Sequence, residues 1–297
     1  MSTPLGLGID AGGTQTRWAL AAAPGTIAAE GAARGMSALQ LRSGDCLREA
    51  LAELASAVLA HGRPTRVHAG LTGLGNEIDS LRALIAAPLG LEPHAVVVTS
   101  DIEIAYLDVF APGEGYVVYA GTGSVAAFVD SAGVLHRAGG RGMLLDDGGG
   151  GSWIAREALR HVWRAEDERP GSWRESPLAA ALFERIGGSD WSHSREFIYE
   201  RDRGELGRLA LAVAETADRD PASRAILAAA GGELARLARA MLQRHGPRPL
   251  ALAGRVPQMH ALIADSMRAS LPQGATMRVC DSLGHHAAAR LALRAAR

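Results

Sequence analysis

The chain begins with two strand-like segments joined by a short glycine-rich turn. An apolar run over residues 5–9 ends at Asp10 and the pair Gly12 and Gly13, and a second strand-like run covers residues 17–23. In a dinucleotide-binding fold, the G-x-G-x-x-G turn leads from a strand directly into a helix. Because this turn leads into another strand, the segment predicts a β-hairpin and argues against a Rossmann fold.

The opening pattern returns in the middle of the chain. A strand over residues 116–120 leads through a turn of small residues into a strand over residues 125–129. Between the two hairpins, a helix over residues 46–61 is followed by alternating strands and helices. A repeated unit of this kind predicts two α/β lobes, each of which carries one such turn.

The boundary between the predicted lobes lies near residue 112. We expect the N-terminal lobe to comprise residues 1–112 together with a C-terminal helix over residues 285–297. The C-terminal lobe then comprises residues 113–284. Within it, apolar residues at helical spacing predict a helical insertion from about residue 152 to residue 245.

Composition excludes several classes of protein. All 31 basic residues are arginine, and a Walker P-loop, a protein-kinase-like site and Schiff-base chemistry each need a lysine. The net charge of −1 gives no reason to expect nucleic acid or a membrane surface as a partner. No signal peptide or membrane span is predicted, so we expect a cytoplasmic protein. Cys46 and Cys280 fit neither a disulfide framework nor a metal site.

Both turns carry residues suited to binding phosphate. Backbone N–H groups, hydroxyls and a metal-binding carboxylate can support phosphoryl transfer without lysine. Asp10, at the end of the first strand, is predicted to hold Mg²⁺. The predicted phosphate contacts are Gly12, Gly13, Thr14 and Thr16 in the first turn and Gly121, Thr122, Gly123 and Ser124 in the second. Either turn alone could be an ordinary tight turn, whereas two matching turns favour a shared nucleotide site.

An ordered set of short motifs resembles one known family. The segment from Gly8 to Thr16 resembles the first phosphate motif of the BadF/BadG/BcrA/BcrD ATPase family, in particular its N-acetylglucosamine kinase-like branch. Further matches follow in the family's order at residues 70–73, 99–101, 120–124, 139–142, 153–155 and 252–254. The resemblance implies an α/β, two-lobed actin/hexokinase-like (ribonuclease H-like) fold, with a mixed sheet and helices in each lobe and a central nucleotide cleft.

The resemblance also implies roles for individual residues. Asp101, at the end of a strand, would be the catalytic base, although an aspartate there could instead cap a helix. The implied substrate contacts are Ser37, Thr72, Asp101 and Asp147, and the implied nucleotide contacts in the last motif are Gly254 and Arg255. Gly148 stands where the family has a glutamate, and Arg255 where it has a glycine. His285 and His286 stand where small residues are common, and we interpret them as structural.

These observations predict an ATP- and Mg²⁺-dependent phosphotransferase. The expected reaction is phosphorylation of the 6-hydroxyl of N-acetylglucosamine or glucosamine, by a protein that forms a homodimer. One alternative is a non-catalytic sugar or nucleotide sensor on the same fold. Another is an ATPase activator of a radical dehydratase or reductase, which would need cysteines near the second turn to bridge an iron–sulfur cluster. Cys46 and Cys280 lie elsewhere.

Overall fold

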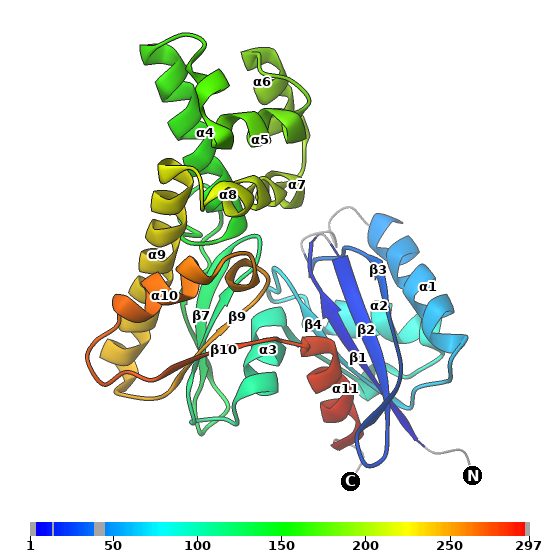
Figure 1. The fold of residues 1–297 in the computed structure, drawn as a ribbon. Coiled ribbons are helices and arrows are strands. Elements are labelled where there is room, and N and C mark those ends of the chain that lie inside the picture. Colours follow the sequence, from blue (N-terminus) through cyan, green and yellow to red (C-terminus); the bar gives the residue numbers. More distant parts are fainter. Residues whose placement is uncertain (1–3, 14, 39–44, 295–297) are drawn as a thin grey trace. The chain divides into compact units, whose positions relative to one another are not determined.

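The computed structural model describes residues 4–13, 15–38 and 45–294 (Figure 1). The chain divides into two compact units, which we call unit 1 (Met1–Ala111 with Ser282–Arg297) and unit 2 (Pro112–Asp281). Each unit holds one five-stranded sheet, in the order β3-β2-β1-β4-β5 in unit 1 and β10-β9-β6-β7-β8 in unit 2. The predicted α/β class, with a mixed sheet and helices in each lobe, is confirmed.

Unit 1 begins with the predicted hairpin. Its strands are β1 (Leu5–Ala11), β2 (Gln15–Ala22), β3 (Thr26–Arg34), β4 (Arg66–Leu71) and β5 (Val96–Ser100). Its helices are α1 (Asp45–Leu59), α2 (Ile78–Leu89), the short 3₁₀ helix η2 (Pro93–Ala95), α3 (Asp101–Val109) and α11 (Gly284–Arg294). β2 pairs antiparallel with β1 and β3, whereas β4 pairs parallel with β1 and β5. The parallel strands β1, β4 and β5 therefore all end at one edge of the sheet.

Unit 2 repeats this strand topology. Its strands are β6 (Tyr116–Ala120), β7 (Ser124–Val129), β8 (Leu135–Gly139), β9 (Leu250–Ala253) and β10 (Met277–Cys280). β7 pairs antiparallel with β6 and β8, and β9 pairs parallel with β6 and β10. The chain thus repeats its opening pattern, as the sequence predicts.

A series of helices separates β8 from β9 in unit 2 (Figure 1). They are α4 (Gly151–Glu168), the 3₁₀ helix η3 (Ser172–Glu175), α5 (Pro177–Ile186), α6 (Trp191–Glu200), α7 (Arg203–Arg208), α8 (Ala210–Thr216) and α9 (Pro221–His245). The 3₁₀ helix η4 (Val256–Gln258) and α10 (Ala261–Ala269) then lie between β9 and β10. The helices between β8 and β9 thus span Gly151–His245.

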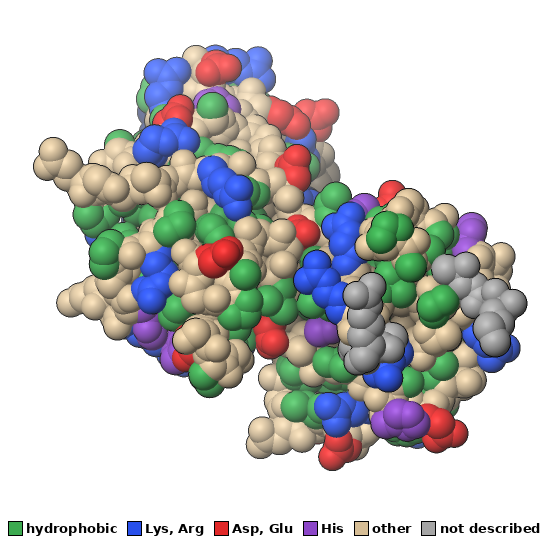
Figure 2. All heavy atoms as spheres, turned by 90° about the horizontal axis from the view of Figure 1, so that it is seen from below, with side chains coloured by type: hydrophobic (Ala, Val, Ile, Leu, Met, Phe, Trp, Pro, Cys, Tyr) green, Lys and Arg blue, Asp and Glu red, His purple; other side chains and the backbone are tan. Residues whose placement is uncertain are grey.

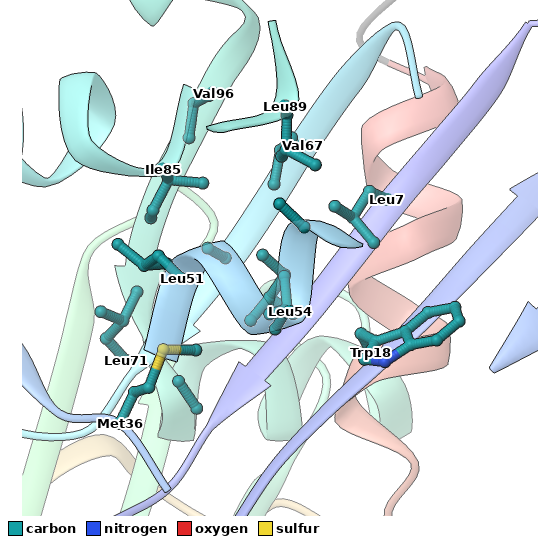
Figure 3. Close-up of a cluster of buried hydrophobic side chains, with 14 of the residues drawn as sticks. Leu7, Trp18, Met36, Leu51, Leu54, Val67, Leu71, Ile85, Leu89 and Val96 are labelled. Carbon is teal, nitrogen blue, oxygen red and sulfur yellow. The ribbon is translucent and has the colours of Figure 1, made fainter. Parts of the chain in front are cut away.

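The sheet of unit 1 packs differently on its two faces. Leu7, Ile9 and Ala11 of β1 point into a buried core shared with α1 and α2, part of which Figure 3 shows. The residues that alternate with them face α11. A Cβ atom at Gly8 would lie 2.1 Å from the carbonyl oxygen of His285 in α11. Glycine at this position therefore lets α11 lie directly on the sheet.

No helix among the described residues is long and apolar enough to cross a bilayer. The face of the molecule in Figure 2 carries both basic and acidic side chains, and neither sign covers it. This mixture agrees with the net charge of −1.

Candidate functional site

Three chain segments of unit 1 meet just beyond the end of β1. The N–H of Thr72, which follows β4, donates to the carbonyl of Ala11 at 3.0 Å. The N–H of Met36, which follows β3, donates to the carbonyl of Gly12 at 3.0 Å, and the N–H of Ala38 donates to the carbonyl of Thr72 at 3.0 Å. These bonds place the half-buried Ser37, between Met36 and Ala38, beside the first turn.

Asp101 lies at the same edge of the sheet, immediately after β5. The hydroxyl of Thr72 donates to Oδ2 of Asp101, and the backbone N–H of Ile102 donates to its Oδ1 at 2.9 Å. The N-cap of α3 is Ser100, so Asp101 is the first residue of the helix and the capping interpretation is wrong. Both carboxylate oxygens are thus oriented by donors, and the carboxylate stays half-exposed.

Asp10 has an unusual electrostatic environment. It is the penultimate residue of β1, opposite Arg17 of β2 and Gly70 of β4. Burial and the negative charges of Asp101 and Asp108 together raise the pKa of Asp10 to about 7, against the opposing charge of Arg17. A cation would relieve this repulsion between carboxylates. The oxygen donors present here therefore fit Mg²⁺.

The remaining residues of the first turn are placed in different ways. Gly13 is exposed, and a Cβ atom there would meet no protein atom within 4 Å. Thr14 lies outside the described residues. Thr16 is fully buried in β2, on the face that it shares with Trp18, and its hydroxyl has no hydrogen-bond partner among the described residues. The predicted phosphate contact of Thr16 is not supported, because strand alternation turns its side chain into the core.

The second turn, in unit 2, is bonded to the start of α4. The N–H of Gly151 donates to the carbonyl of Gly121 at 2.9 Å. The carbonyl of Thr122 accepts from the N–H of Ser152 at 2.9 Å and from its hydroxyl at 2.8 Å. In the described part of the chain, no acceptor binds the N–H groups of Thr122 and Gly123. Two successive N–H groups of this kind can bind an anion.

Ser124 does not complete this arrangement. Its side chain is only 4% exposed, and its hydroxyl donates to the carbonyl of Gly148 at 2.7 Å. The hydroxyl therefore holds the 148 segment against β7. The phosphate contact predicted for Ser124 is not supported, because its hydroxyl already donates a hydrogen bond to the carbonyl of Gly148.

Asp147 is buried beneath the second turn. It is 2% exposed, has a positive φ of 60°, and forms an ion pair with Arg203 at the start of α7. A Cβ atom at Gly123 would lie 2.7 Å from Oδ2 of Asp147. The carboxylate predicted to bind the substrate thus binds an arginine, and its contact with a sugar stays a prediction. Sequence patterns did not indicate Arg203, which follows Asp147 by 56 residues.

Gly148, which stands where the resembled family has a glutamate, also has a neighbour that the sequence did not indicate. A Cβ atom at Gly148 would lie 2.6 Å from Oε2 of Glu233 in α9. Arg236 donates to Glu233 at 2.8 Å and to Asp146 at 2.9 Å. A carboxylate from α9 therefore occupies the space that a side chain at position 148 would need.

Gly254 and Arg255 follow β9, which runs parallel to β6 with Ala253 opposite Tyr119. Gly254 has a φ of 103°, and a Cβ atom there would lie 2.3 Å from the carbonyl oxygen of Ala120. Glycine is required at this position for both reasons. The structure thus places Gly254 beside the second turn and leaves Arg255 exposed.

Comparison with known proteins agrees with this arrangement. A model of the BadF/BadG/BcrA/BcrD ATPase family matches residues 7–269. A solved structure from Chromobacterium violaceum, provisionally named an N-acetylglucosamine kinase, is 26% identical, with a TM-score of 0.72 over 99% of this chain and 100% of that chain.

Two further solved structures share the fold at lower identity. A protein from Porphyromonas gingivalis, also provisionally named an N-acetylglucosamine kinase, is 18% identical, with a TM-score of 0.72 over 97% of this chain and 99% of that chain. A ROK family glucokinase from Streptomyces griseus, in complex with glucose and AMPPNP, is 16% identical, with a TM-score of 0.67 over 98% of this chain and 99% of that chain. These neighbours confirm the predicted actin/hexokinase-like fold.

Proposed function

The chain belongs to the BadF/BadG/BcrA/BcrD ATPase family, and we propose that it is an ATP- and Mg²⁺-dependent kinase of N-acetylglucosamine or glucosamine. The phosphoryl group would be transferred to the 6-hydroxyl of the sugar. The observation that carries this proposal is the Asp101 carboxylate, oriented by Thr72 at the strand edge that also bears Asp10. The provisional name of the 26% identical neighbour supports the choice of substrate.

In this proposal Asp101 is the catalytic base. Its carboxylate accepts the proton of the sugar hydroxyl while the hydroxyl oxygen forms a bond to the γ-phosphorus of ATP. The bond between that phosphorus and the β–γ bridging oxygen breaks, and ADP leaves. Thr72 and the N–H of Ile102 hold the carboxylate in place. Ser37, beside the first turn, is suited to donate to or accept from a sugar hydroxyl.

Asp10 would hold the metal ion. When bound, Mg²⁺ neutralises charge on the phosphate oxygens. The raised pKa of Asp10 supports this assignment, because it reflects a buried carboxylate that lies near the negative charges of Asp101 and Asp108 and is only partly offset by Arg17. The exposed Gly13 lets a phosphate approach the backbone closely.

Unit 2 would bind the phosphates and the nucleoside of ATP. The N–H groups of Thr122 and Gly123 are suited to phosphate oxygens. Gly254 and Arg255 lie beside this turn and are proposed to contact the nucleotide. Thr16 and Ser124 take no part, because both hydroxyls are buried.

A coupled ADP-release assay over a panel of hexoses and amino sugars tests the proposal. We expect ATP turnover that N-acetylglucosamine or glucosamine stimulates and that requires Mg²⁺. Thermal stabilisation by ATP and sugar without turnover would instead support the sensor. The homodimer stays a prediction, which sedimentation velocity would test.

A further inference from the structure

A cluster of three metal-ligating side chains lies in unit 1, outside the residues described above. Glu30 belongs to β3, where it lies opposite Ala19 of β2. His285 and His286 belong to the first turn of α11. One ligand atom from each of these three side chains lies within 4.8 Å of the other two, and the described residues contain no second group of this kind.

One carboxylate oxygen joins the cluster. Oε2 of Glu30 accepts a hydrogen bond from Nε2 of His286 and lies 3.6 Å from Nε2 of His285. The two imidazole rings have centroids 4.4 Å apart. Adjacent residues of a helix normally point in different directions, so the convergence of both rings on Glu30 is a specific arrangement.

His285 forms the buried part of the cluster. His285 is 5% exposed, and its Nδ1 has no hydrogen-bond partner among the described residues. Burial and the charges of His286 and Arg17 together lower the pKa of His285 to about 4, against the opposing effect of Glu30. The hydrogen bond from His286 holds the pKa of Glu30 below its usual value. Two imidazoles and a carboxylate can supply the neutral nitrogen and anionic oxygen ligands that metals bind.

Access and charge also permit binding. The side chain of Glu30 is 57% exposed, whereas that of His285 is 6% exposed, so the site has a buried wall and an open side. Ligand atoms around a tetrahedral ion lie roughly 3.3 Å apart. Rotation of the exposed Glu30 can widen its contact with His286 to that separation. The carboxylate also offsets the charge of Arg17, which would otherwise repel a cation.

We propose that Glu30, His285 and His286 bind a divalent transition-metal ion of the Zn²⁺ type. Two imidazoles and one carboxylate suit Zn²⁺, Co²⁺, Ni²⁺ or Cu²⁺, whereas Mg²⁺ prefers oxygen ligands alone. Three protein ligands leave a further position for water. This site differs in chemistry from the Mg²⁺ site proposed at Asp10.

The ion would fasten α11 to the sheet. Glu30 and His286 are 256 residues apart in sequence, so the ion would join two distant segments of unit 1. The first residue of α11, Gly284, lies against Asp10, since a Cβ atom there would be 3.1 Å from its Oδ2. Fixing the start of α11 therefore also fixes a neighbour of Asp10. An ion that binds only the folded chain stabilises it.

Zn²⁺ titration of the untagged, chelator-stripped full chain tests the proposal. Isothermal calorimetry, with a chromogenic chelator as competitor, is expected to show one Zn²⁺ per chain. Glu30→Gln and His286→Gln, at exposed or accessible positions, are expected to weaken binding by roughly 10–100-fold or more. The matched control His94→Gln, at an exposed position away from α11, should bind as the wild type does.

A second measurement distinguishes loss of metal binding from misfolding of the variants. Co²⁺ should give the wild type a visible d–d absorption band that excess Mg²⁺ does not abolish and that both variants lack. Both variants should also lose the Zn²⁺-induced rise in unfolding temperature while melting like the stripped wild type without metal. Absence of stoichiometric Zn²⁺ binding to the wild type, or equal affinity in Glu30→Gln and His286→Gln, would overturn the proposal.

Discussion

His68 makes the stability of unit 1 depend on pH. It lies in β4, and its Nε2 is 3.2 Å from the hydroxyl oxygen of Thr99 in β5. Thr72 follows His68 by four residues, and Asp101 follows Thr99 by two. This contact therefore joins the two strands that lead to Thr72 and to the proposed base Asp101. Burial lowers the pKa of His68 from its ordinary 6.5 to about 4. The folded chain therefore holds His68 neutral over a range in which the unfolded chain protonates it.

The sign and size of the effect follow from these two pKa values. The contribution of neutral His68 to the free energy of unfolding is complete above pH 6.5. It decreases progressively as the pH falls and is lost below pH 4. One pKa unit corresponds to about 1.4 kcal/mol, so the complete effect is roughly 3 kcal/mol. Between pH 7.5 and pH 5 the free energy of unfolding is expected to decrease by about 2 kcal/mol. This is less than the complete effect, because pH 5 still lies above the pKa of His68 in the folded chain.

His68→Gln tests this expectation, because glutamine keeps a polar group beside Thr99 but does not titrate. Urea unfolding of the wild type and the variant from pH 7.5 to pH 5 gives the stability difference, from which other titrating groups cancel. We expect this difference to shrink by about 2 kcal/mol as the pH falls. Hydrogen exchange of β4 and β5 locates the effect in unit 1. The exposed His94→Gln should follow the wild type, and parallel curves for wild type and His68→Gln would refute the reasoning.

Substitutions at Thr72, Gly8 and Gly13 test the site and the packing around it. Thr72→Val removes the hydroxyl that donates to Asp101 and should lower kcat by roughly 10–100-fold, whereas Thr72→Ser should retain most activity; equal kcat values for both would contradict the role of the hydroxyl. Gly8→Ala puts a Cβ atom 2.1 Å from the carbonyl oxygen of His285 and should cost about 3 kcal/mol in urea unfolding. Gly13→Ala, where no atom lies within 4 Å, should change stability by less than about 0.5 kcal/mol, and an equal loss in both glycine variants would count against the packing of α11.

Much of the fold could be predicted because it depends on local patterns. Apolar runs bounded by glycine gave the strands, and their repetition gave the two similar sheets. The ends of helices depend on tertiary packing as well as on local residue preferences. Proline usually ends a helix, yet α2 continues through Pro88 to Leu89, and its C-cap is Gly90, whose φ of 67° suits glycine.

In the candidate site, too, the positions of residues follow local patterns, whereas their side-chain contacts depend on tertiary structure. The positions of Asp10 and Asp101 at strand ends could be predicted, and the structure places both at one sheet edge, whereas their roles stay predictions. Thr16 and Ser124 also stand in the turn motifs, but the direction of their hydroxyls depends on strand alternation and on neighbouring carbonyls. Contacts made across long separations in the chain left no local pattern, and Arg203 beside Asp147 is one of them.

The most direct test of the central claim is to identify the phosphorylated product. Wild-type protein, [γ-³²P]ATP, Mg²⁺ and N-acetylglucosamine or glucosamine should yield a labelled sugar phosphate in a single turnover, and NMR should place the phosphate on the 6-oxygen. Asp101→Asn should still bind ATP but form this product roughly 10²–10⁴-fold more slowly, because it lacks a base for the hydroxyl proton. Wild-type rates in Asp101→Asn, or no sugar phosphate from the wild type, would contradict the account.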